Sequence, residues 1–134
     1  MSGCSLMADI YFASTADRPS DLEVGDCLLR DPMDDALHDV EIVDCSETHE
    51  AEVYASATMD DGEYPGQRKV EEMVRDICVE EFAWFIHIAP SESELDYFAF
   101  HPTETMWNLF DYRQITCIAV DPEGTTGSLV GANR

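Results

Sequence analysis

The residues best suited to chemistry are a histidine and several carboxylates between positions 44 and 52. His49 is followed three residues later by Glu52, and the acidic neighbours are Asp44, Glu47 and Glu50. A histidine beside a carboxylate can act in acid–base catalysis, and such a cluster can bind a divalent cation. However, side chains three residues apart meet only on a helix, whereas this stretch has a strand pattern. We therefore expect no catalytic residue and no metal site, and we interpret His49 and Glu52 as an interaction site or a turn site after Cys45.

The cysteines are the second group of reactive side chains. They lie at positions 4, 27, 45, 78 and 117, and no two form a CxxC pair. Structural zinc sites usually use such short-spaced pairs, so the spacing favours disulfides over a metal. Four cysteines in the folded region allow three connectivities. We favour Cys27–Cys45 and Cys78–Cys117, which pair neighbours in the N-terminal half and tie the central helix to a later strand. Disulfides indicate an oxidising compartment, and four reduced, buried cysteines in a cytosolic protein are the alternative.

The fifth cysteine, Cys4, is a candidate lipidation site. It follows Ser2-Gly3, which is similar to the end of a lipoprotein cleavage motif, where the cysteine becomes the lipidated N-terminus. A free thiol after two small residues is the alternative. Residues 1–21 end in a polar stretch without periodicity and are expected to form a flexible tether. Residues 22–134 are expected to form one domain.

The composition is strongly acidic. Asp and Glu number 29 against 7 Lys and Arg, which gives a formal net charge of −22. Nucleic-acid backbones and anionic lipid headgroups repel such a surface, so we expect no nucleic-acid partner and membrane contact only through a lipid on Cys4. Basic proteins or cations are the partners that this charge favours. No run of about 18 apolar residues is present, so no segment is expected to span a bilayer.

The elements that position these residues follow from the hydrophobic pattern. Between residues 68 and 85, apolar residues have the i, i+3, i+4, i+7 spacing of one helical face, which predicts the main helix. Strands are expected at 24–29, 39–45, 51–57, 95–100, 114–120 and 126–130, with a turn at 121–124 and a capped helical turn at 102–107. The strands at 39–45 and 51–57 are expected to form a hairpin. These elements predict an α+β fold: a small antiparallel sheet with one main helix packed on it and two disulfides.

Seven segments form an ordered series of motifs along the chain. They are residues 24–27, residues 43–53 with Cys45, His49 and Glu52, then Tyr64-Pro65-Gly66, Cys78, residues 102–107, residues 113–117, and residues 127–131. Together they resemble the septum formation domain family over residues 22–131. This resemblance implies an envelope protein of Actinobacteria, often attached to a lipobox or a transmembrane helix, with a suspected link to cell division and no demonstrated chemistry.

One segment departs from the family pattern, in which a tryptophan is followed by two residues and then Gly-Asp-Arg. Here Trp107 and Arg113 are separated by residues 108–112, which contain no glycine and one apparent insertion. A turn conformation that favours glycine is therefore not expected. Trp107 and Arg113 are candidate interaction or turn residues. We favour Trp107 as a core plug, and a partner-binding patch is the alternative.

The predicted function is a non-enzymatic, extracytoplasmic binding domain of an envelope protein linked to cell division. No nucleophile motif and no glycine-rich phosphate loop occurs in the sequence. We expect no cofactor, and the expected partner is a protein or a cell-wall component. The alternatives are an envelope hydrolase that uses His49 with an acidic neighbour, and a cytosolic acidic binding module with reduced cysteines.

Overall fold

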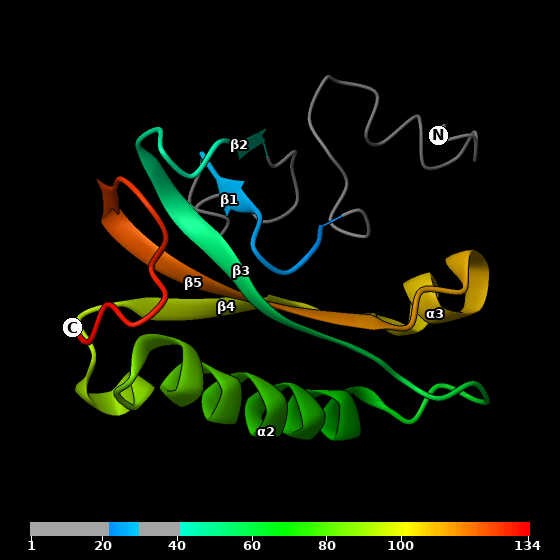
Figure 1. Ribbon diagram of the computed structural model, residues 1–134. Helices are drawn as coiled ribbons and strands as arrows, with labels where there is room; N and C mark the ends of the chain where they lie inside the picture. The colour runs from blue at the N-terminus through cyan, green and yellow to red at the C-terminus, as the bar shows by residue number, and fades with distance from the viewer. Residues whose placement is uncertain (1–21, 30–40) are drawn as a thin grey trace.

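A five-stranded antiparallel sheet forms the centre of the molecule, and one long helix covers one of its faces (Figure 1). The computed structural model describes residues 22–29 and 41–134. The strand order is β2-β1-β3-β5-β4, and each neighbouring pair is antiparallel. The strands are β1 (Cys27–Leu28), β2 (Ile42–Val43), β3 (His49–Thr58), β4 (Asp96–Phe100) and β5 (Gln114–Thr125). The predicted α+β fold class is confirmed.

The main helix, α2 (Gln67–Ile86), confirms the helical spacing of apolar residues in this stretch. Its fully buried side chains are Val70, Cys78, Phe82 and Ile86. Burial of a Phe or Ile side chain contributes about 1.5–3 kcal/mol, so this face holds the helix on the sheet. The helix ends at Ile86. The next residue, His87, donates the last helical hydrogen bond from its N–H to the Ala83 carbonyl oxygen at 2.9 Å, and its left-handed backbone then turns the chain away from the helix.

Two shorter helical segments lie between α2 and the last strand. The 3₁₀ segment η2 (Pro90–Glu92) precedes β4, and α3 (Glu104–Phe110) connects β4 to β5. The Thr103 hydroxyl oxygen caps α3 by accepting the Met106 N–H at 3.2 Å. The predicted capped helical turn is therefore confirmed, and it continues to Phe110. Within the described residues, no helix combines the length and apolar character needed to cross a membrane.

Both faces of the sheet are buried, and β5 shows this most clearly. Cys117 and Ala119 belong to the core between the sheet and α2, whereas Ile118 and Val120 belong to the core on the opposite face. Successive side chains of a strand point to opposite faces, so a strand covered on both sides is apolar at every position. This explains why the stretch that predicts this strand is apolar at every position from 117 to 120.

The predicted hairpin between residues 39–45 and 51–57 is wrong. β1 lies between β2 and β3, because Cys27 pairs with Val43 on one side and with Glu52 on the other. The edge of β3 that the hairpin would need is therefore occupied by β1. β1 and β2 are also shorter than predicted, since each has two residues.

A β-bulge changes the faces of β3. The sequence predicts Val53, Ala55 and Ala57 on one face, but Val53 lies in the core opposite α2 and Ala55 lies in the core beneath α2. The pairing register of β3 shifts between Val53 and Ala55. An extra residue in one strand moves the following side chains to the other face, which a strict alternation pattern does not reveal.

The predicted turn at 121–124 and the predicted strand at 126–130 are also wrong. β5 continues to Thr125, and residues 126–130 contain no strand. His49 pairs with Thr125 and Ala51 pairs with Val120, so one residue of β3, Glu50, lies opposite four residues of β5, 121–124. Pro122 lies in this irregular stretch, where its missing N–H interrupts no regular ladder.

Two disulfides connect the elements, with the predicted pairing. Cys27–Cys45 joins β1 to the turn after β2 with a Cα–Cα distance of 5.3 Å, and Cys78–Cys117 joins α2 to β5 with a distance of 5.6 Å. They close loops with sequence separations of 18 and 39 residues. The loop-entropy model gives about 3 and about 4 kcal/mol for loops of these lengths. Cys4 and the rest of the predicted tether, residues 1–21, lie outside the described residues.

Candidate functional site

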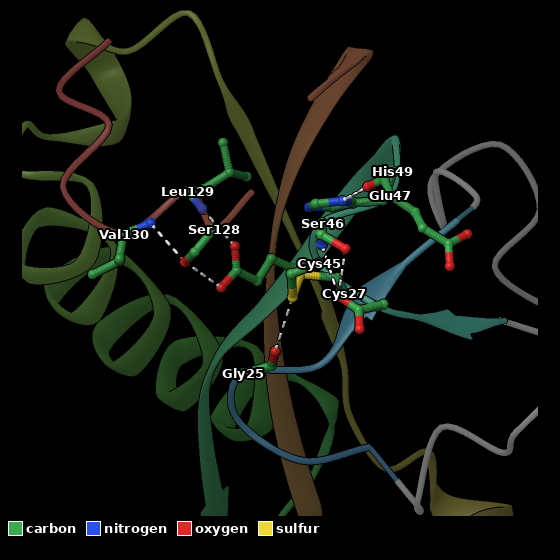
Figure 2. Close-up of a disulfide and its surroundings, with 11 residues drawn as sticks. Gly25, Cys27, Cys45, Ser46, Glu47, His49, Ser128, Leu129 and Val130 are labelled. Carbon is green, nitrogen blue, oxygen red and sulfur yellow. Dashed lines mark hydrogen bonds between the residues drawn. A yellow bond between two sulfur atoms is a disulfide. The ribbon is translucent and has the colours of Figure 1, made fainter. Parts of the chain in front are cut away.

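Three segments of the motif series meet around the Cys27–Cys45 disulfide (Figure 2). Cys27 comes from β1, and Cys45 lies before β3. The third segment is the C-terminal stretch after β5, where the Gly127 N–H donates to the Cys45 carbonyl oxygen at 2.6 Å. The disulfide therefore lies where the first, second and last parts of the motif series come together.

Glu52 binds the C-terminal stretch through both carboxyl oxygens. Oε1 accepts the Leu129 N–H at 2.6 Å, and Oε2 accepts the Ser128 hydroxyl at 2.8 Å. The Ser128 oxygen also accepts the Val130 N–H at 3.1 Å. Glu52 is only 3% exposed, and a buried carboxyl group without partners would be strongly destabilising. These hydrogen bonds satisfy the buried group and fix residues 128–130 beside β3.

His49 is fully buried and bonds within its own turn. Its Nδ1 lies 2.7 Å from the Glu47 carbonyl oxygen, so Nδ1 carries the proton and donates it. Its Nε2 is buried and has no hydrogen-bond partner within residues 22–29 and 41–134. From the sequence, His49 and Glu52 are a possible pair, but in the described residues each has its own hydrogen-bond partners.

The turn before β1 positions Cys27 against β3. The Gly25 N–H donates to the Val53 carbonyl oxygen at 2.9 Å, and the Val53 N–H donates to the Asp26 carbonyl oxygen at 2.8 Å. Gly25 has a φ of 101°, a conformation that glycine adopts without the clash of a Cβ atom. This local requirement explains the glycine directly before Asp26-Cys27.

The turn after β2 is stabilised by Asp44. Its carboxylate accepts the Ser46 N–H at 2.9 Å and the Ser46 hydroxyl at 2.8 Å. These two hydrogen bonds lower the pKa of Asp44 below its usual value, and the bond from the backbone N–H has the larger effect. Asp44 therefore stabilises the turn that contains Cys45.

The disulfide limits what metal chemistry this cluster can do. The ligand atoms of Cys27, Cys45 and Glu52 lie within 4.8 Å of one another. Metal ions bind cysteine as thiolate, and both sulfur atoms are here joined to each other. Both oxygens of Glu52 are also engaged by residues 128–129. In the oxidised protein, this cluster is therefore a structural junction.

Trp107 and Arg113 form a second, separate cluster at the α3 end of the sheet. Trp107 is 3% exposed, and its indole N–H donates to the Gly62 carbonyl oxygen at 2.9 Å. The Arg113 guanidinium lies 3.8 Å above the indole ring and donates to the Trp107 carbonyl oxygen at 3.0 Å. Tyr64 contacts the same ring edge-on. The structure places Trp107 in the core beneath α2, and Arg113 holds it there.

The loop between Trp107 and Arg113 adopts the conformation that the sequence did not predict. Asp111 has φ 56° and ψ 34°, the left-handed turn that glycine usually occupies at the end of a helix. Asp is among the few residues that tolerate this conformation. Its carboxylate also lies 2.9 Å from Arg113 Nη2, an ion pair that glycine could not make. The absence of glycine therefore leaves the turn intact.

Sequence reasoning found the residues of this region but missed the partner of Glu52. An acidic residue between the apolar Ala51 and Val53 was the available signal, because an isolated buried carboxyl group requires donors from another segment.

Trp84 was also missed, although it is 74% exposed on α2. Its place between the buried Phe82 and Ile86 was the signal for an outward-facing side chain.

The fold and this junction define a small, disulfide-bonded α+β domain. Residues 12–132 match the family model described as septum formation. The chain therefore belongs to the septum formation family, as the motif series indicates. Comparison with curated proteins and with solved structures gives no match. The family and the two disulfides are compatible with a cell-division-related envelope protein outside the cytoplasm.

Proposed function

We propose that this chain is a non-enzymatic binding domain of a division-related envelope protein and acts outside the cytoplasm. The main support for this proposal is that the two best candidates for catalytic residues, His49 and Glu52, have structural roles. His49 is fully buried with its Nδ1 bonded to Glu47, and both oxygens of Glu52 bind residues 128–129. A general acid or base must reach a substrate atom, and neither group faces solvent.

The cysteines support the extracytoplasmic part of the proposal. Disulfides persist in oxidising compartments and are rare in the cytosol. Both disulfides connect separate elements of the fold, so they contribute to its stability. We further propose a lipid anchor on Cys4, which would hold the domain at the outer face of the cytoplasmic membrane. The partner is a protein or a cell-wall component, and an actinobacterial source follows from the family resemblance.

Crosslinking in an exporting bacterial host tests this proposal. The chain has one lysine but 29 carboxylic side chains, so a carbodiimide that joins carboxylates to partner amines is the suitable reagent. We expect a discrete crosslinked partner in the envelope fraction. The buried His49 should not affect that product, so a His49→Gln variant should give the same partner.

Two outcomes contradict the proposal. Absence of any crosslinked partner from the wild-type protein would contradict the binding function. A His49→Gln variant that folds and retains its partner, but fails to support septation in cells, would contradict the non-enzymatic role. The exposed Glu63→Gln variant serves as the matched control for handling and expression.

A further inference from the structure

The outer face of α2 carries an exposed tryptophan. Trp84 is 74% exposed, the largest value among the exposed large apolar side chains of the described residues. It lies two positions after Phe82 and two before Ile86, both fully buried. Two helical residues rotate the side chain by about 200°, so Trp84 points away from the core. The sheet covers the opposite side of α2 (Figure 1), so the described elements leave this indole uncovered.

The surroundings of Trp84 are acidic. Glu80 and Glu81 precede it by one helical turn, and both are exposed. The last turn of α2 contains no basic residue, and the C-terminal end of a helix carries a partial negative charge. The nearest basic residue on the helix, Arg75, lies nine positions earlier, which is about half a turn away around the axis. No cation of α2 therefore neutralises this surface.

We propose that Trp84, Glu80 and Glu81 form a docking surface for a Lys- or Arg-rich protein segment. An indole face attracts a cationic group, and the aliphatic part of a Lys or Arg side chain can pack against the ring. The two carboxylates add charge complementarity. A second copy of this chain is disfavoured as the occupant, because each copy carries a net charge of −22. The inference rests on the proposed binding function and specifies its partner chemistry.

The two tryptophans of the sequence allow a direct binding measurement. Trp107 is 3% exposed and Trp84 is 74% exposed, so an added peptide acts mainly on the emission of Trp84. The oxidised protein would be titrated with a Lys/Arg-rich peptide and with the same peptide carrying Gln at each basic position. We expect saturable quenching or enhancement with the basic peptide and none with the neutral one.

Calorimetry on matched variants tests the site. Trp84→Ala should weaken binding of the basic peptide about 3- to 30-fold, the range expected for loss of a cation–π contact. Leu109→Ala is the control, because Leu109 is 72% exposed on α3. It should leave the affinity unchanged.

A second pair of variants separates local charge from net charge. Glu80→Gln/Glu81→Gln and Glu71→Gln/Glu72→Gln each remove two negative charges from exposed positions of α2. We expect a loss of about fivefold or more for the pair beside Trp84 and less than about twofold for the distant pair. Equal losses would show non-specific attraction and overturn the site.

Other results also overturn the inference. These are no binding of the basic peptide, Trp84-dependent binding to anionic or zwitterionic vesicles, and Trp84-dependent self-association in sedimentation. If the crosslinking experiment yields an envelope partner that Trp84→Ala does not affect, this docking surface is wrong while the proposed binding function stands. If no partner is found at all, the proposed function fails first.

Discussion

At the residue scale, the junction at Glu52 joins segments that lie far apart in the sequence. The carboxyl group is buried in β3 and receives hydrogen bonds from Ser128 and Leu129, more than 70 positions later in the sequence. The adjacent disulfide links Cys27 and Cys45 in the same region. A substitution in any one of these segments therefore affects the contacts of the others.

Removal of the Glu52 carboxyl group should destabilise the domain. Glu52→Ala leaves the buried Leu129 N–H without an acceptor, and each lost hydrogen bond to a charged group costs about 1.5–3 kcal/mol. We expect a loss of about 2–4 kcal/mol in the free energy of unfolding, measured by urea denaturation. Glu63→Ala, at an exposed position, should change stability by less than about 0.5 kcal/mol. Equal effects of the two variants would contradict the anchoring role.

The buried tyrosines predict a loss of stability at alkaline pH. Burial raises the pKa of Tyr112 to about 12 from its usual value of 10.0, and burial also raises the pKa of Tyr54 above its usual range. The unfolded chain therefore releases these protons at lower pH than the folded chain does. The free energy of unfolding should be constant with respect to these groups below pH 10 and should fall as the pH rises towards about 12.

Tyr112→Phe tests this pH dependence, and a Cys4→Ser background prevents thiol exchange at high pH. The Tyr112 hydroxyl is buried and makes no well-formed hydrogen bond in the described part of the chain, although the neighbouring Thr116 hydroxyl opposes the rise in its pKa. Its removal should therefore cost little at pH 7. The variant should lose less stability than the wild type above pH 10 in denaturation experiments. An identical decline in the two proteins would contradict the assignment.

At the element scale, the sequence predicts elements well where one pattern dominates. The spacing from Val70 to Phe82 predicts α2, and the largely apolar stretch at 115–120, with one threonine, predicts β5, because burial on one or both faces fixes the choice of residues. The placement of β1 between β2 and β3 could not be predicted in this way. A two-residue strand has too few positions to show a pattern, and its neighbours depend on pairing with distant residues.

Irregular pairing explains the other errors. The bulge between Val53 and Ala55 reverses the faces of β3, and the extra residues opposite Glu50 carry β5 past Pro122. Both are features of the pairing between distant strands, which local sequence patterns do not report. The same limit applies to the candidate site, since its residues are recognisable but the hydrogen bonds between Glu52 and Ser128 come from the tertiary structure.

The end of α3 gives a prediction about an element boundary. Asp111 occupies the left-handed region with φ 56°, where a β-branched residue is strongly disfavoured. Asp111→Val should destabilise the protein by about 1–3 kcal/mol, whereas Asp111→Gly should have a smaller effect because the relief of backbone strain offsets loss of the Arg113 ion pair. Thermal and urea denaturation measure both. Comparable losses for valine and glycine would contradict a requirement for this turn.

At the scale of the whole molecule, the net charge of −22 opposes compaction. Added salt screens this repulsion, since the Debye length falls from about 10 Å at 0.1 M to about 3 Å at 1 M ionic strength. Of the five ion pairs among the described residues, two are long, at 4.0 and 3.7 Å, and three are 2.9 Å. Screening weakens all of them, but with only 7 Lys and Arg against 29 Asp and Glu the repulsion is the larger effect. The midpoint of thermal unfolding should therefore rise with sodium chloride. A fall would show that attractive pairs outweigh the repulsion.

The central claim, a disulfide-bonded domain that acts outside the cytoplasm, is tested most directly by the oxidation state of its cysteines. The protein would be produced with its natural upstream sequence in a host that exports it, alkylated without reduction, and analysed by intact mass and peptide mapping. We expect peptides that link Cys27 to Cys45 and Cys78 to Cys117, with Cys4 outside both disulfides and carrying a lipid. Four alkylated thiols at positions 27, 45, 78 and 117 would contradict it and favour a cytosolic protein with reduced cysteines.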